Sequence, residues 1–265
     1  MSDEAPLAGM LARALGIAVE DVRREALGTR EGVERERVRF RSGAEERSVV
    51  FERVAPRVAL EVQLLPFLSR RTPSVPVVHA RGIPPATVAA PQWLLVEDLE
   101  DAPSACDRDP REIVEALVRT QEAVARDAPA LRALGVPERS PADLAEEIAA
   151  AAAGAPGAEA VAAEAREAAR RLRAWPSALV HGDLRCANAV ATERGVVLRR
   201  WSGAHLGCGL LDVARLVADL VARDDAVRGI GLSRVYAERV GRVLPTETLR
   251  GAEKLDALVR RHLAR

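Results

Sequence analysis

The chain has 265 residues, more than one hydrophobic core usually organises, so its length predicts two lobes or two small domains. Hydrophobic residues make up 48% and charged residues 29%, which excludes a disordered or fibrous protein. The formal net charge is zero and the arginines are spread along the chain, so we expect no nucleic-acid partner.

The first hundred residues favour strands, because polar and apolar positions alternate there between glycines. The predicted elements of this part are a short helix at 6–15, three antiparallel strands within 17–55, a helix at 58–68, and strands at 75–80 and 93–96. We therefore expect residues 1–98 to form an N-terminal lobe, an antiparallel sheet with one main helix.

The rest of the chain has mainly helical periodicity. The predicted helices span 111–126, 141–153 and 158–175, with further helices from residue 210 to the end. The second of them has a serine N-cap at Ser140 and a proline in its first turn, which is a typical helix start. Residues 99–265 are therefore expected to form a helical C-terminal lobe.

The cysteines and the N-terminus bear on the cellular location. Cys106, Cys186 and Cys208 form no C-x-x-C pair, and three is not a count suited to a closed disulfide framework, so free thiols in a reducing cytoplasm are expected. The N-terminus lacks a basic segment followed by an apolar run, and no stretch approaches eighteen apolar residues. We expect a cytoplasmic protein with no export signal and no membrane partner.

The most specific pattern is the segment LVHGDLRCANAV at residues 179–190. It resembles the H-G-D-x-x-x-x-N catalytic loop of the aminoglycoside phosphotransferase and choline kinase-like family. Downstream, residues 198–201 resemble the next strand of that family, and Gly207 with Asp212 resembles its G-x-x-x-x-D-x-A pattern. The resemblance implies an α+β, two-lobed protein kinase-like fold whose C-terminal lobe carries the catalytic-type loop 181–188.

The resemblance extends to the N-terminal lobe. Residues 49–52 look like the strand that carries the phosphate-binding lysine, and Glu61 lies where the glutamate partner of that lysine belongs. Residues 93–99 look like the hinge strand. The nucleotide-binding residues implied by the resemblance are Glu52, Glu61, Glu97, Asp98 and Leu99.

The family chemistry gives the motif residues their expected roles. Phosphoryl transfer depends mostly on positioning and on metal ions that neutralise the phosphate oxygens. By resemblance, Asp183 would accept the proton of a substrate hydroxyl, Asn188 would bind magnesium, and Asp212 would brace the loop. The resemblance therefore implies ATP and magnesium as cofactors of an active member.

Two positions depart from the family pattern. Arg200 stands where the main magnesium-binding aspartate should be, and a cation cannot ligate magnesium. On the third strand, the position expected to hold lysine is Glu52, and the only lysine in the chain is Lys254. Arg53 would replace that lysine only after a one-residue slip, which would turn the apolar positions of the strand to the wrong faces.

These changes predict a pseudokinase that has lost phosphotransfer with MgATP, needs no cofactor, and binds a small molecule or a protein partner. We expect Arg200 to pair with Glu52, Asp183 or Glu61, since a buried unpaired charge is costly; the alternative is a solvent-exposed side chain. A second hypothesis is an atypical phosphotransferase acting on a small hydroxylated molecule, with Asp183 as base and Asn188 as the remaining metal ligand. A third is a structural subunit that binds nothing.

Two further polar residues are given structural roles. His181 is interpreted as a histidine that shapes the loop rather than as a base. Gln121 lies where the family often has a histidine, so this position also departs from the pattern.

Overall fold

The structure, a computed structural model, describes residues 4–30, 32–55, 59–83 and 91–263. The chain divides into two compact units, Met1–Ala102 and Pro103–Arg265. The sequence places the boundary a few residues earlier, after residue 98. Among the described helices, none is long and apolar enough to cross a membrane.

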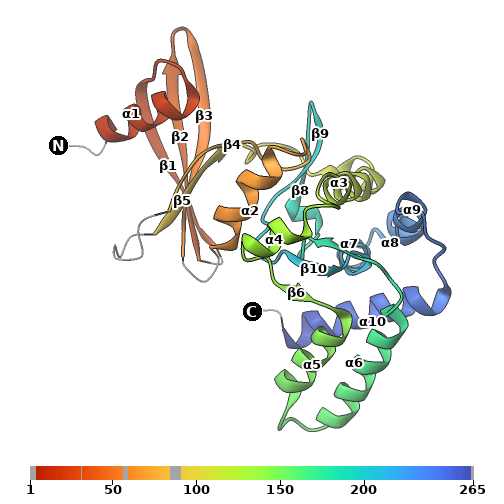
Figure 1. Cartoon of the computed structure of the whole chain (residues 1–265). Coiled ribbons are helices and arrows are strands. Elements are labelled where there is room, and N and C mark those ends of the chain that lie inside the picture. Colours follow the sequence, from red (N-terminus) through yellow and green to blue (C-terminus); the bar gives the residue numbers. More distant parts are fainter. Residues whose placement is uncertain (1–3, 31, 56–58, 84–90, 264–265) are drawn as a thin grey trace. The chain divides into compact units, whose positions relative to one another are not determined.

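The N-terminal unit is built on a five-stranded antiparallel sheet with the strand order β1-β2-β3-β5-β4 (Figure 1). Its elements are α1 (Glu4–Leu15), β1 (Glu20–Arg30), β2 (Val33–Ser42), β3 (Glu45–Val54), α2 (Leu60–Ser69), β4 (Val78–Gly82) and β5 (Gln92–Glu97). The predicted sheet is confirmed. Strand β4 begins later than the expected Val75, and Pro76, which has no N–H for a sheet ladder, lies just before it. The predicted first residue of α2, Val58, lies outside the described residues.

The two faces of β3 have different environments. Val49 belongs to a buried apolar cluster with Leu11 of α1 and Leu95 of β5. Because side chains alternate along a strand, Glu52 lies on the other face, as the sequence predicts. The register places Arg35 of β2 directly opposite Glu52.

The C-terminal unit is mainly helical. Its helices are α3 (Pro110–Ala123), α4 (Ala128–Ala133), α5 (Pro141–Ala152), α6 (Ala158–Leu172), α7 (Leu210–Ala222), α8 (Ala226–Gly229), α9 (Leu232–Arg239) and α10 (Thr246–His262), with 3-10 turns η2 (Ala105–Asp107) and η3 (Cys186–Asn188). Ser140 caps α5 as predicted, because its hydroxyl accepts from the backbone amide of Asp143. Helix α10 packs against α5, α6 and α7, and α3 packs against α9.

Two small sheets position the loop of this unit. Strands β6 (Glu138–Arg139), β10 (His205–Cys208) and β7 (Ser177–Val180) form one, and β8 (Ala189–Thr192) pairs with β9 (Gly195–Leu198) in the other. Residues 181–188 connect β7 to β8, and α7 follows β10 (Figure 1). Strands β7 and β10 were not predicted from the sequence, because strands of four residues are too short to show a clear alternation.

The segment after β5 is attached to the sheet by a buried arginine. Arg37 of β2 is 5% exposed, and its guanidinium forms ion pairs with Asp98 (2.7 Å) and Asp101 (2.9 Å). The two carboxylates differ in environment, since the side chain of Asp98 is 9% exposed and that of Asp101 is 83% exposed. A buried pair is far more sensitive to the loss of one partner than an exposed pair.

We expect Asp98→Ala to lower the free energy of unfolding by about 3 kcal/mol, because it removes the buried counter-ion of Arg37. Asp101→Ala removes a carboxylate from the same guanidinium at an exposed position and should cost at most about 1 kcal/mol. Urea unfolding followed by circular dichroism measures both variants. Equal losses would contradict the assignment of this stabilisation to the buried pair.

Candidate functional site

The predicted catalytic-type loop is folded around one buried carboxylate. Asp212, in the first turn of α7, is 2% exposed and accepts hydrogen bonds from the backbone amides of His181 (2.6 Å) and Gly182 (2.9 Å). Gly182 has a φ of +85°, and a Cβ there would lie 2.1 Å from the carbonyl oxygen of Gly203. Glycine is therefore required at this turn. The geometry suits the bracing role predicted for Asp212.

His181 is a buried structural residue of the loop. Its Nδ1 accepts a hydrogen bond from the backbone amide of Asp183 (3.2 Å), so Nε2 carries the proton and donates to the carbonyl oxygen of Arg199 (2.9 Å). Its ring contacts that of Trp201, with 4.6 Å between centroids. Burial lowers the pKa of His181 to about 4, so the ring is neutral at physiological pH. This environment supports the interpretation of His181 as a histidine that shapes the loop.

Asp183 is surrounded by hydrogen-bond donors. Its Oδ2 accepts from Arg185 (2.6 Å) and from the side-chain amide of Asn188 (2.9 Å), and its Oδ1 lies 3.5 Å from Arg215. Arg215 is in turn paired with the buried Asp256 at 2.7 Å. The side chain of Asp183 remains 28% exposed. The predicted base is thus held in place by fixed donors and is still reachable from solvent.

Arg200 contacts the residue that the sequence predicts as a metal ligand. Asn188 is completely buried, and its Nδ2 donates to the carbonyl oxygen (2.8 Å) and carboxylate (2.9 Å) of Asp183. Its Oδ1, the atom that would ligate a metal, accepts a hydrogen bond from Nη1 of Arg200 at 3.3 Å. Arg200 has a φ of +66°, a left-handed conformation that costs a non-glycine residue about 1 kcal/mol. The guanidinium of Arg200, a residue with a strained backbone, therefore contacts the oxygen that is expected to ligate a metal.

The residues of this unit do not fit the divalent metal that the resemblance implies. The predicted ligand oxygen of Asn188 faces a guanidinium, and Arg200 occupies the position of the expected carboxylate. Within residues 4–30, 32–55, 59–83 and 91–263, no group of three or more His, Cys, Asp or Glu side chains could hold a metal ion. A positive charge close to a cation site disfavours metal binding there.

The N-terminal unit has an arginine that the sequence analysis missed. Glu52, at the expected lysine position, pairs with Arg35 across the β2–β3 ladder at 3.1 Å, and Arg35 also pairs with Glu100. Their side chains are mostly buried, with 15% of Arg35 and 13% of Glu52 exposed. Strand pairing sets residues of neighbouring strands side by side. Arg35 could therefore be identified as the partner of Glu52 only with the register between β2 and β3.

The one-residue slip that would bring Arg53 to the lysine position is not formed. Arg53 pairs with Glu34 (3.2 Å) and Glu36 (2.7 Å) and lies over the ring of Phe51, on the face opposite to Glu52. The strand pairing that places Glu52 opposite Leu94 of β5 agrees with this orientation.

The other predicted nucleotide-site residues lie on α2 and after β5. Glu61 is buried in the first turn of α2. Glu97 accepts a hydrogen bond from the backbone amide of Val77 (3.1 Å), Leu99 is 6% exposed, and Asp98 pairs with Arg37. Their role in nucleotide binding stays a prediction.

The expectation of three free thiols is wrong for two of them. Cys106 in η2 and Cys186 in η3 form a disulfide across 80 residues of sequence, while Cys208 is free and buried. The spacing rule failed because tertiary packing brings η2 against the loop. The predicted cytoplasmic location therefore loses the support of the cysteine pattern.

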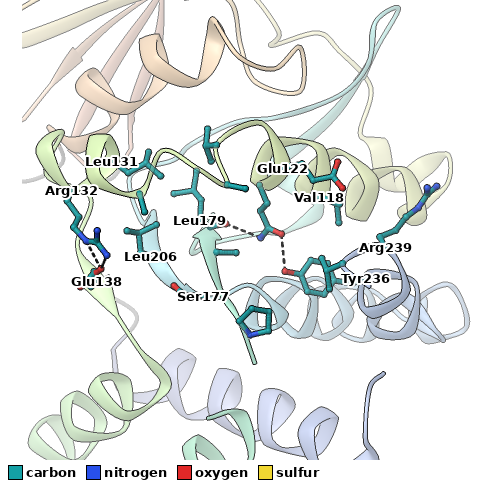
Figure 2. Close-up of a pocket in the computed structure, with 17 residues that line it drawn as sticks. Val118, Glu122, Leu131, Arg132, Glu138, Ser177, Leu179, Leu206, Tyr236 and Arg239 are labelled. Carbon is teal, nitrogen blue, oxygen red and sulfur yellow. Dashed lines mark hydrogen bonds and ion pairs between the residues drawn. The ribbon is translucent and has the colours of Figure 1, made fainter. Parts of the chain in front are cut away.

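Gln121 has a structural role at the end of α3. Its Nε2 donates to the carbonyl oxygen of Leu179 in β7, and its Oε1 accepts from the hydroxyl of Tyr236 in α9, both at 2.9 Å. These residues contribute to a pocket of about 420 Å³ in the C-terminal unit, shown in Figure 2. Arg132 and Glu138 form an ion pair at its edge. The pocket therefore combines an apolar interior with charged groups at its surface.

We expect the stability of the protein to depend on Asp212 between about pH 4 and 7. Burial raises the pKa of Asp212 to about 7, although the amides of His181 and Gly182 oppose this shift. The folded state therefore holds a proton on Asp212 that the unfolded state has lost, so the contribution of Asp212 to stability falls as pH rises across this range. The buried His181 and His205, whose pKa values are lowered to about 4, contribute in the opposite direction. Asp212→Asn should therefore make stability rise more steeply with pH than in the unmodified protein and, since an amide nitrogen cannot accept from a backbone N–H, cost about 1–3 kcal/mol.

Urea unfolding at several pH values tests this dependence on Asp212. Glu238→Gln, which removes an exposed carboxylate on α9, is the control and should leave the pH profile unchanged. A profile of Asp212→Asn parallel to that of the unmodified protein would contradict the raised pKa.

Comparison with known proteins places the chain among phosphotransferases. The sequence profile of the phosphotransferase enzyme family (APH) matches residues 26–244. No protein of curated function matches the sequence. The structure is similar to that of the aminoglycoside phosphotransferase APH(3'')-Id from Streptomyces rimosus, with 22% identity, a TM-score of 0.58, and 97% of this chain and 99% of that chain covered.

Two further solved structures share the fold. A choline/ethanolamine kinase family protein from Mesorhizobium loti has 17% identity and a TM-score of 0.61, with 96% of this chain and 82% of that chain covered. The amicoumacin kinase hAmiN, in complex with AMP-PNP, Ca²⁺ and Ami, has 11% identity and a TM-score of 0.63, with 99% of this chain and 87% of that chain covered. Because the family profile covers most of the chain and the α+β kinase-like fold agrees with it, the protein belongs to the phosphotransferase enzyme family.

Proposed function

We propose that this protein is a member of the phosphotransferase family that no longer transfers phosphate with MgATP and instead acts by binding a small molecule or a protein partner. The observation that carries the proposal is the hydrogen bond from Arg200 to Oδ1 of Asn188. That oxygen is the metal ligand implied by the family resemblance, and here it faces a fixed positive charge.

The charges explain why an arginine in place of the expected aspartate at position 200 would strongly weaken metal binding. Phosphoryl transfer needs metal ions that bridge and neutralise the phosphate oxygens. A guanidinium attracts phosphate but has no lone pair with which to bind a metal. Two like unit charges about 4 Å apart repel by about 4 kcal/mol at an effective dielectric constant of 20, close to a thousandfold in affinity. Arg200 therefore disfavours a metal wherever its guanidinium stays near Asn188.

The N-terminal unit supports the same proposal. At the expected lysine position, Glu52 adds a negative charge, and Arg35 pairs with both Glu52 and Glu100, which places that arginine between two carboxylates. The positive charge of Arg35 is offset by these two protein carboxylates. Arg35 therefore attracts phosphate less strongly than a lysine with a single glutamate partner would.

A binding role requires a place for the partner, and the pocket of Figure 2 is of suitable size. Its volume of about 420 Å³ falls within the range of small-molecule sites. Apolar side chains such as Leu131 and Leu206 line it, and Arg132 and Glu138 lie at its edge. This composition suits a small ligand with both apolar and polar groups, without nucleic acid or a membrane as partner.

The second candidate is an active phosphotransferase that uses ATP and a divalent metal, as is usual in the family. Two observations favour it: Asp212 accepts hydrogen bonds from the amides of His181 and Gly182, and Asp183 remains partly exposed. Asp183 would then take the proton of a hydroxyl on a small acceptor molecule. In this case Arg200 would have to leave Asn188 before a metal could bind.

We expect the unmodified protein to show no magnesium-dependent thermal stabilisation by ATP, whereas Arg200→Asp combined with Glu52→Lys should gain it, and each single change should gain less. The first substitution removes the cation from Asn188 and supplies the missing carboxylate, and the second supplies the missing lysine. A ligand at one hundred times its dissociation constant stabilises by about 2.7 kcal/mol, which raises the melting temperature of a chain of this size by about 5–11 °C. Differential scanning fluorimetry with ATP, with and without magnesium, measures the shift.

Arg194→Asp is the matched control, because it makes the same charge change at an exposed position in the β8–β9 turn. It should gain no stabilisation. A magnesium-dependent shift in the unmodified protein, or ATP turnover that Asp183→Asn abolishes, would overturn the proposal and establish the phosphotransferase candidate instead.

A further inference from the structure

The disulfide joins the catalytic-type loop to the start of the C-terminal unit. Cys186 lies between Asp183 and Asn188, and Cys106 lies in η2, the first turn of the unit. Both cysteines are buried, at 1% and 3% exposure. The cross-link therefore attaches the residues that hold Asp183 and Arg200 to a segment 80 residues earlier in the chain.

Weaker contacts join the same two segments. The hydroxyl of Ser104 lies 3.4 Å from the carbonyl oxygen of Cys186, and the backbone amide of Ala191 donates to the carbonyl oxygen of Pro103 at 2.8 Å. From the other side, Asp219 of α7 accepts a hydrogen bond from the backbone amide of Cys186 at 2.9 Å. The disulfide is the covalent bond among these contacts. If it is lost, the two segments are held together only by hydrogen bonds, each of which contributes little.

We infer that Cys106 and Cys186 are positioning residues whose disulfide fixes the loop 181–188, and that the geometry of Asp183 and Asn188 therefore depends on the thiol–disulfide state of the protein. The inference concerns regulation of the site on which the proposed function rests. It does not depend on whether that site transfers phosphate.

The chemistry is thiol–disulfide exchange with a low-molecular-weight thiol. A thiolate of the glutathione class attacks one sulfur of the protein disulfide, the S–S bond breaks, and the other cysteine leaves as a thiolate that takes up a proton. A second glutathione resolves the mixed disulfide, giving two protein thiols and one glutathione disulfide. Formation is the reverse, with glutathione disulfide as the oxidant that takes the two electrons.

Burial makes this exchange depend on opening of the loop. Since the two sulfurs lie on residues with almost no exposure, a reductant reaches them only when η2 or η3 moves away from its neighbours. Reduction then removes the covalent bond that holds η3 next to η2. Asn188, the last residue of η3, is the group whose position changes most directly.

Alkylation under denaturing conditions, followed by intact mass measurement, tests the pairing. Cys208 is an internal reference, because it is free and burial raises the pKa of its thiol to about 12, so it stays an unreactive thiol until the protein unfolds. Protein equilibrated with glutathione disulfide should take up one N-ethylmaleimide, and protein reduced by dithiothreitol before denaturation should take up three. Three additions in both samples would overturn the inference.

Hydrogen exchange measured by mass spectrometry tests the positioning. Cys106→Ser breaks the disulfide without substituting any residue of the loop, and should speed exchange of the backbone amides of Cys186 and Asn188 at least tenfold, because both amides donate hydrogen bonds in the folded loop. Cys208→Ser is the matched control and should leave these amides unchanged. Exchange in helix α10 should not change in either variant, which separates loop positioning from a general loss of stability.

If Cys106→Ser does not fold, the unmodified protein is reduced by dithiothreitol and the same amides are followed, and re-oxidation with glutathione disulfide should restore their protection. Unchanged exchange of the loop on reduction would overturn the inference. A redox effect on the loop in a protein that nevertheless binds magnesium with ATP would refute the proposed function and leave this inference standing.

Discussion

The geometry of the C-terminal unit depends on the buried carboxylate of Asp212. By accepting the amides of His181 and Gly182, it fixes a left-handed turn that the chain can make only with glycine. That turn orients Asp183, whose own amide donates to His181, and the carboxylate and carbonyl of Asp183 then hold the amide of Asn188. Each later contact therefore depends on the position of the polar group before it, and His181, Asn188 and Asp212 are all buried from water.

Arg200 lies at the end of this series of contacts. The family resemblance implies that the asparagine of the loop ligates a metal, but in this chain its side-chain oxygen accepts a hydrogen bond from a guanidinium. The backbone hydrogen bonds that fold the loop and the side-chain atoms implied in catalysis are separate groups, so the loop keeps its fold with an arginine at position 200. Fold and family alone do not decide the activity.

The sheet of the N-terminal unit and the long helices of the C-terminal unit were predictable, because alternation and helical periodicity are local signals. Strands of only four residues, such as β7 and β10, carry no such signal. The environment of Glu52 was also hidden, since its partner Arg35 is fixed by the β2–β3 register. The pairing of Cys106 with Cys186 was missed for a similar reason, because it joins positions that are remote in sequence.

The sequence by itself determined the family, the loop 181–188 and the two charge changes at Glu52 and Arg200, because each is a matter of residue type at a fixed spacing. The tertiary structure decided which groups those charges meet. Hydrogen bonds and ion pairs act over a few ångströms, and only folding brings residues of different segments within that range, such as Arg200 and Asn188 at the two ends of the β8–β9 hairpin.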